Sequence, residues 1–463
     1  MLLALHGKMG MPSNQGTRAL GTEQQECPSP PSALAESVNG PHIGAIQLVV
    51  IALCFSAQMI DGFDNQASAF VAPALAGSWH VSRAAFGAVF GAGAFGTLIG
   101  SLLIGPIGDL LGRKTLIVLS LGLSAVLMGA TPLVHSVSAL AVIRFLTGLP
   151  LGALIPGTIV VANEWVPTRS RTTLVTMMAC GFAFGAVLGG QLSAILLPRL
   201  GWHSVFYAGA LGSAVVCAAI TLWLPESLRF LLLRPTKAKL ARAQRILGAL
   251  GPEMPVTAAP EPALLTSPVR GLFAGSRTPM TLLLWSAFFA NALVLNFMTF
   301  WLPTLLMTSG LEAATAIRLS TLFQLGGIVG VVFMGSVSVR LNAWRVVVAG
   351  YLLSAAAVIL VGLLEAPVRN AAILFSGFGI IGVQMSLASI GACLYPTEMR
   401  ATGTSWALGM GRIGSTIGPL LGGILVGQHW AQPRLFETMA LVPLAGSILV
   451  AVLAKRAAAV QLK

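Results

Sequence analysis

Long apolar runs constrain this chain more than any other feature of its sequence. Twelve such runs follow one another between residues 46 and 454. About 20 consecutive apolar residues form a helix that can cross the ~30 Å hydrocarbon core of a bilayer. Only 9% of the residues are charged, against about 25% in a typical soluble domain, which is too few to cover a surface that faces water. The sequence therefore predicts an all-α polytopic membrane protein.

The runs fall into two halves of six. A polar segment rich in basic residues and proline separates the halves, and the first 42 residues have the composition of a disordered tail. We predict a disordered cytoplasmic tail over 1–42, a six-helix bundle over 43–224, a central loop over 225–277, a second six-helix bundle over 278–456 and a tail over 457–463. The predicted spans are 46–74, 84–107, 115–134, 138–162, 172–196, 204–224, 278–304, 316–336, 344–364, 370–394, 400–427 and 435–454.

The basic residues predict how the chain is oriented. If the N-terminus is cytoplasmic, 20 of the 27 Lys and Arg residues lie in inside loops and tails, five in outside loops and two within spans. This bias follows the positive-inside rule. It predicts a multi-pass protein of the inner, cytoplasmic membrane, with both termini and the central loop in the cytoplasm. The net charge of +13 then needs no nucleic acid as a partner, and the lipid bilayer is the expected surroundings.

The two halves resemble each other in sequence. "PTRSR" at 167–171 precedes the fifth span, and "PTEMR" at 396–400 precedes the eleventh, 229 residues later. At the same offset, Gly185 matches Gly414 and Gly189 matches Gly418. A duplicated six-helix half with substrate bound between the halves is the architecture of secondary transporters.

Two aspartates interrupt the first apolar run, in the stretch "DGFDNQASAF" at 61–70. Asp61 and Asp64 are three residues apart, so they are neighbours on one helix face. Ionisable groups at membrane depth are costly and mark functional sites. Burial and a neighbouring like charge both favour the protonated carboxyl group, so the pair is a candidate proton-coupling site. A salt bridge that locks the first span to a neighbouring span is the structural alternative.

Two arginines also lie within predicted spans. Arg144 begins the fourth span at nearly the depth of Asp64, counting ~1.5 Å per residue, and is a candidate partner of the aspartates. Alternatively, it snorkels to the outer interface. Arg412 lies in the middle of the eleventh span, where snorkelling is harder. Because a guanidinium group binds carboxylates bidentately, Arg412 is a candidate site for a carboxylate ligand, with a backbone carbonyl as the structural alternative.

Uncharged polar side chains near the middle of the spans extend this candidate substrate site. Each amide could bond a ligand hydroxyl or carboxylate, or could instead join two helices. An aromatic side chain could stack on a ring, although a lipid-facing or interfacial aromatic is the commoner outcome. Besides Arg144 and Arg412, the candidate substrate site contains Asn291, Asn296, Gln324, Gln384 and Trp301.

Several motifs resemble those of the major facilitator superfamily: "GPIGDLLGRK" at 105–114, "RFLTGLPLGALIPGTIVVANEWVPTRSR" at 144–171 and "LPESLRFL" at 224–231. "DGFD" in the first span, "GWHSVF" at 201–206 and the stretch from "YPTEMRATG" to "GMGRIG" at 395–414 are similar to its aromatic acid/proton symporter branch. The resemblance covers about 46–455 and implies import of 4-hydroxybenzoate, protocatechuate, benzoate or similar acids together with protons.

The resemblance also implies roles for single residues. Asp61 and Asp64 would couple transport to protons, and His203 would be the outer-loop histidine of the branch, although one loop histidine is more often a solvated or capping residue. Two features depart from the family pattern: Leu110 follows Asp109, and serines at 336 and 338 replace an expected acid in the second half. The implied cytoplasmic gate contains Gly105, Asp109, Gly112, Arg113, Lys114, Glu164, Arg171, Arg340 and Arg400.

Together these patterns predict a transporter that imports an aromatic carboxylate with protons by alternating access. We expect a monomer that uses the proton gradient and needs no metal or organic cofactor, because the histidines do not cluster and the cysteines show no paired spacing. Nothing in the sequence resembles an enzyme's nucleophile, metal or phosphate site. The alternatives are a proton-coupled exporter or antiporter of amphipathic compounds and a substrate sensor that does not transport.

Overall fold

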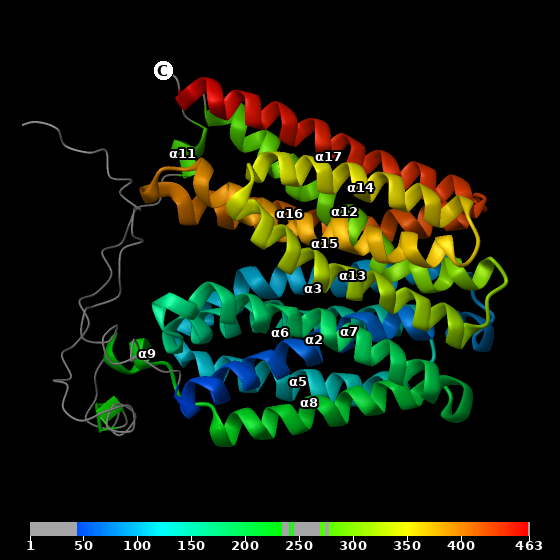
Figure 1. The fold of residues 1–463 in the computed structure, drawn as a ribbon. Coiled ribbons are helices and arrows are strands. Elements are labelled where there is room, and N and C mark those ends of the chain that lie inside the picture. The colour runs from blue at the N-terminus through cyan, green and yellow to red at the C-terminus, as the bar shows by residue number, and fades with distance from the viewer. Residues whose placement is uncertain (1–43, 234–239, 242, 245–268, 274–276, 462–463) are drawn as a thin grey trace, which may run out of the picture.

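The computed structural model describes residues 44–233, 240–241, 243–244, 269–273 and 277–461 (Figure 1). The predicted tail over 1–42, most of the predicted central loop over 225–277 and residues 462–463 lie outside these residues. The long helices are α2 (Ala45–Ser78), α3 (Phe86–Leu103), α5 (Arg113–Ala130), α6 (Val137–Trp165), α7 (Arg171–Leu200), α8 (His203–Trp223), α12 (Arg277–Thr308), α13 (Ala313–Arg340), α14 (Ala343–Leu363), α15 (Val368–Leu394), α16 (Thr397–Gly427) and α17 (Gln432–Gln461). Short helices are η1 (Arg83–Ala85), η2 (Gly105–Ile107), α4 (Gly108–Leu111), η3 (Thr131–Leu133), η4 (Thr168–Ser170), α9 (Leu228–Leu233) and α11 (Val269–Leu272).

Each predicted span coincides with one of these long helices, which confirms the all-α membrane fold. Eleven of the described helices are long and apolar enough to cross a membrane. α16 is outside that set because it carries Arg400 and Arg412 among many Gly, Ser and Thr residues. It nevertheless packs along α12 and α3, as a spanning helix does. The largest boundary difference is at α17, which continues past the predicted limit of 454 through "KRAAAVQ", a sequence of good helix formers.

The helices form two bundles side by side, α2 to α8 in one and α12 to α17 in the other (Figure 1). The same packing recurs in both. Gly185 of α7 lies against the backbone of Met59 in α2, and Gly414 of α16 lies against the backbone of Phe289 in α12. Small residues let membrane helices approach this closely. The glycines that match in the sequence therefore hold equivalent helix pairs in the two bundles.

The start of α2 and the end of α17 lie at one end of the molecule (Figure 1), which we call the basic end because it carries most of the Lys and Arg residues that the structure describes. At the other end, one hydrophobic core joins both bundles, with Phe90 of α3 against Phe300 and Trp301 of α12. Toward the basic end each bundle has its own core, one centred on Trp165 and one on Tyr351. The bundles are thus joined at one end and have separate described cores at the other.

Glycine contacts between α3 and α6 lead to a prediction about folding. A Cβ atom on Gly96 would overlap the backbone carbonyl of Phe145, so Gly96→Val is expected to destabilise the protein by at least about 3 kcal/mol, the upper range for overpacking. Gly335→Val is the matched control, since no described atom lies within 4 Å of a Cβ there. Thermal unfolding of the purified proteins in detergent measures the difference. Equal stability of the two variants would contradict this packing.

Candidate functional site

Asp64 and Arg144 form a buried ion pair inside the first bundle. Arg144 Nη1 donates to Asp64 Oδ1 at 2.9 Å, and Arg144 Nη2 donates to Thr131 Oγ1 at 2.9 Å. The guanidinium carbon also lies 5.2 Å from the centre of the Phe206 ring, within the range of a cation–π contact. Only 5% of Arg144 and 3% of Asp64 are exposed. Arg144 is therefore the partner of an aspartate and does not snorkel to the interface.

Asp61 lies one helical turn nearer the basic end than Asp64 and is equally buried. No hydrogen bond or ion pair joins its carboxyl group to another described residue. Its charge interacts with that of Asp64 and, across the interface between the bundles, with that of Arg412 in α16. The two aspartates thus differ: Asp64 is neutralised within its own bundle, whereas Asp61 faces a cation that the other bundle supplies.

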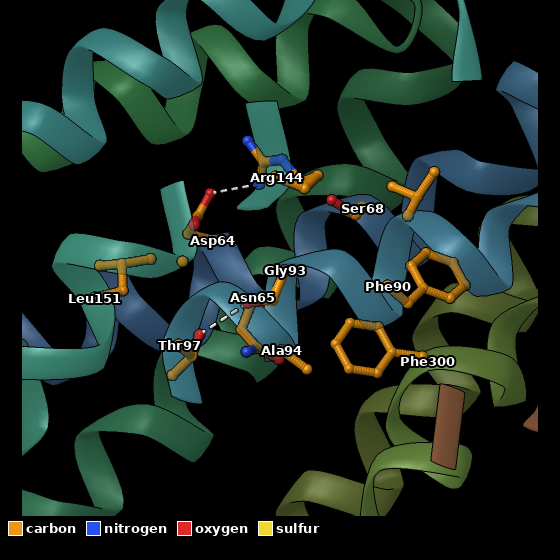
Figure 2. A pocket seen from close by; sticks show the side chains of 12 residues that line it. Asp64, Asn65, Ser68, Phe90, Gly93, Ala94, Thr97, Arg144, Leu151 and Phe300 are labelled. Carbon is orange, nitrogen blue, oxygen red and sulfur yellow. Dashed lines mark hydrogen bonds and ion pairs between the residues drawn. The ribbon is translucent and has the colours of Figure 1, made fainter. Parts of the chain in front are cut away.

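A small pocket at the edge of the first bundle is lined by Asp64 and Arg144 and is bordered by Phe300 of the second bundle (Figure 2). Asn65 and Ser68 of α2, Gly93 and Thr97 of α3, and Phe300 of α12 are among the residues around it. Its volume of about 30 Å³ is close to that of one water molecule. A whole aromatic acid needs several hundred Å³, so this pocket can be only one part of a substrate site.

The predicted amide residues are mostly occupied by contacts between helices. Asn291 donates to the Gln384 side chain at 2.6 Å and to the Ile380 carbonyl at 3.2 Å. Asn296 donates to Ser415 Oγ at 3.0 Å. Gln324 differs, because it is buried and makes no hydrogen bond to another described residue. The amide nitrogen of the half-buried Gln384 donates to no described acceptor. Gln324 and Gln384 are therefore the amides best placed to bind a ligand.

Trp301 does not line the pocket. Its indole Nε1 donates to the Pro419 carbonyl of α16 at 3.0 Å, and its ring is fully buried against Phe90. Phe90 stacks on Phe300 with ring centres 5.0 Å apart, and Phe300 lines the pocket. In this conformation Trp301 therefore closes the bundle interface, and the neighbouring Phe300 takes the position that the sequence led us to expect for Trp301.

The residues of the predicted gate lie at the basic end. Gly112 follows α4 with φ of 98°, a left-handed conformation that glycine adopts without strain. By contrast, no described atom lies within 4 Å of a Cβ on Gly105, so close packing does not explain that glycine here. The Asp109 side chain lies outside the described part. Arg171 and Arg400 are half-buried and Arg340 is exposed.

Glu226 within "LPESLRFL" has a role that was not predicted from the sequence. Glu226 Oε1 accepts from the Lys114 backbone N–H at 3.0 Å, near the first turn of α5. A carboxylate at a helix N-terminus neutralises the partial positive charge there. The Lys114 Nζ donates to the Thr221 carbonyl at 2.7 Å. Lys114 and Glu226 thus connect the end of α8 to the start of α5. The role of Glu226 can be predicted only when these two helices are known to be neighbours.

His203 is the first residue of α8, exposed at the end opposite the basic end. Its ring stacks on Trp202 with centres 3.7 Å apart. It lies on the surface, away from the buried charges, and its geometry fits a solvated residue at a helix start.

Comparison with known proteins identifies this architecture. The Major Facilitator Superfamily matches residues 54–419. The chain belongs to this superfamily. The gallate transporter of Pseudomonas putida is 37% identical over 90% of this chain and 94% of that protein. The 4-hydroxybenzoate transporter PcaK of Pseudomonas aeruginosa is 36% identical over 87% of this chain and 92% of that protein. Both relatives are named as transporters, which are not enzymes.

A solved structure shows the same superfamily fold. The crystal structure of the D-xylose–proton symporter superposes with a TM-score of 0.64, covering 86% of this chain and 97% of that chain at 16% identity. At this identity the likeness concerns the fold, with its two six-helix bundles. The likeness does not extend to the buried charges and the pocket, which depend on the side chains of this chain.

Proposed function

We propose that this protein imports hydroxylated aromatic carboxylates together with protons across the bacterial inner membrane, with its basic end in the cytoplasm. The observation that carries the proposal is the Asp61 carboxyl group, which is buried without an ion pair to a described residue and interacts electrostatically with Arg412 of the other bundle. Because one cation attracts both a titratable acid and an anionic ligand, protonation of the acid changes how tightly the ligand binds. The names of the relatives support a hydroxylated aromatic acid as that ligand.

The proposed coupling is an exchange of counter-ions at Arg412. When Asp61 is ionised, it competes with the substrate for the guanidinium charge. When a proton neutralises Asp61, Arg412 is free to bind the substrate carboxylate, and a guanidinium group binds it well because its planar fork matches two oxygens. Proton and substrate then favour the same loaded state, which is the thermodynamic requirement for symport.

The conformation described here fits one stage of this cycle. The bundles share a core at the end opposite the basic end and have separate cores at the basic end. The positive-inside rule assigns the basic end to the cytoplasm, so this would be an inward-facing carrier. The Asp64–Arg144 pair lies within one bundle and would move with it unchanged, whereas the electrostatic interaction of Asp61 with Arg412 acts across the interface that rearranges.

Uptake of labelled 4-hydroxybenzoate into proteoliposomes tests the proposal. With an outer solution one pH unit more acidic than the lumen, we expect accumulation approaching about tenfold for one proton per substrate anion, because a difference of one pH unit provides about 1.4 kcal/mol per proton. Collapsing the gradient with a protonophore should abolish accumulation. Efflux driven by the same inward proton gradient would instead identify a proton antiporter, and binding without flux would identify a sensor.

A further inference from the structure

The small pocket beside Asp64 is a polar recess that the packing of the protein does not explain. Ser68 Oγ is buried and has no hydrogen-bond partner among the described residues, and the same is true of Arg144 Nε. The half-buried Asn65 side chain makes no hydrogen bond to a described residue. Buried polar groups are almost always paired, so three unpaired groups around one recess indicate that it receives a polar guest.

Gly93 keeps this recess open. Its neighbours in α3 are packing glycines: a Cβ on Gly91 would lie 2.6 Å from Leu420, and one on Gly96 would overlap the Phe145 backbone. A Cβ on Gly93 would have the Arg144 carbonyl as its nearest atom, at 3.7 Å, which is an ordinary contact. Glycine at 93 is therefore not required for helix packing, and its missing side chain leaves space in the pocket.

The chemistry and size of the recess select its guest. A volume of about 30 Å³ accepts a single hydroxyl group or water molecule. The rings of Phe90 and Phe300 border it on the side of the second bundle (Figure 2), where they could contact the edge of an aromatic ring. Ser68 and Asn65 can each donate a hydrogen bond to a hydroxyl group and accept one from it. An unsubstituted ring offers neither hydrogen bond.

The distance along α2 between the recess and the proposed carboxylate site can be compared with the length of a substrate. Along α2, Asn65 is four residues and Ser68 seven residues beyond Asp61, or roughly 6 and 10 Å at 1.5 Å per residue. The axial distance to Asn65 is similar to the length of a 4-hydroxybenzoate from its carboxylate to the hydroxyl group across the ring, and Ser68 lies nearly one helical turn farther along. A substrate whose carboxylate binds Arg412 near Asp61 could therefore place its ring hydroxyl in the recess.

We propose that Asn65, Ser68 and Gly93 form a subsite for one ring hydroxyl group of the substrate and make the transporter selective for hydroxylated aromatic acids over unsubstituted benzoate. This inference rests on the proposed function, since it concerns the same substrate site. It adds the chemical group that is recognised and the residues that recognise it. Bound benzoate would leave Ser68 and Asn65 unpaired, which disfavours its binding.

Competition binding tests the subsite. Inhibition constants of benzoate, 3-hydroxybenzoate and 4-hydroxybenzoate are measured against labelled 4-hydroxybenzoate on purified protein, for the wild type and for Ser68→Ala, Gly93→Ala and the control Gly335→Ala. The wild type and the control are expected to prefer a hydroxybenzoate over benzoate by about 10- to 100-fold. Ser68→Ala and Gly93→Ala are expected to lose most of this preference, mainly by binding the hydroxybenzoate more weakly while benzoate binding stays within a factor of three.

The outcomes separate the subsite from the proposed function. If the wild type binds and transports aromatic acids but Ser68→Ala and Gly93→Ala keep the wild-type preference, the subsite is wrong and the proposed function stands. If Ser68→Ala changes the proton dependence of uptake without changing the preference, the recess holds water alone and the subsite is also wrong. If the wild type neither binds nor transports any of the three acids, both proposals fail together.

Discussion

Replacing Asp64 alone with asparagine is expected to remove most of the folded protein from the membrane. The substitution leaves the buried Arg144 guanidinium without its counter-ion, 5% exposed between Thr131 and the Phe206 ring. Breaking a buried ion pair by removing one partner costs about 3–5 kcal/mol. Removing both charges, in Asp64→Leu with Arg144→Met, should recover most of that stability because neither member of this pair is then left as a buried charge without its counter-ion.

Thermal unfolding in detergent of Asp64→Leu, Arg144→Met and the double variant measures the coupling between the two residues, because a cycle needs the same substitutions singly and together. The expected coupling free energy is at least about 2 kcal/mol, because each single change leaves a buried charge without its counter-ion. Arg434→Met is the matched control: Arg434 packs on Trp430 at the opposite end, where surface changes shift stability by about 0.5 kcal/mol or less. If Asp64→Asn is as stable as this control, Asp64 is not the structural member of the aspartate pair.

The helices and the Asp64–Arg144 pair could be predicted because they depend on quantities that a sequence expresses directly. An apolar run long enough to cross the bilayer must be helical, because lipid offers no hydrogen bonds to an open backbone. The depth of a residue follows from its position in the run, at ~1.5 Å per residue. That was enough to place Arg144 at the level of Asp64, and the unfavourable burial of each charge made their pairing the natural expectation.

Other contacts depend on how each helix is rotated and which helices are neighbours, and the sequence of one chain does not express these. Arg412 has no acid in its own half at its depth, and only the packing of α16 against the first bundle brings it near Asp61. Trp301 and Phe300 are adjacent in sequence, yet one is buried in the interface and the other lines the pocket. Gly91, Gly93 and Gly96 look alike in the sequence, yet Gly91 and Gly96 lie at close helix contacts and Gly93 does not.

The second large effect concerns Asp61, the aspartate without an ion-pair partner. Asp61→Asn is expected to fold normally, because it removes a buried charge and strands none within the first bundle. It should abolish accumulation driven by a pH gradient, so that the internal substrate concentration only equals the external one. Substrate exchange across the membrane should persist, because Arg412 remains available to the carboxylate. Counterflow of labelled against unlabelled 4-hydroxybenzoate in proteoliposomes measures exchange without any gradient.

The pH dependence of binding distinguishes counter-ion exchange from a general loss of activity. In the wild type, ionised Asp61 competes for Arg412, so substrate affinity should fall as pH rises through the range in which Asp61 loses its proton. In Asp61→Asn this competition is absent, and affinity should stay at the higher level across the same range. Arg412→Gln should lose both exchange and binding, by about 100-fold or more, since a charged hydrogen-bonded pair is removed. An Asp61→Asn protein that still concentrates substrate against its gradient would show that the coupling proton binds elsewhere.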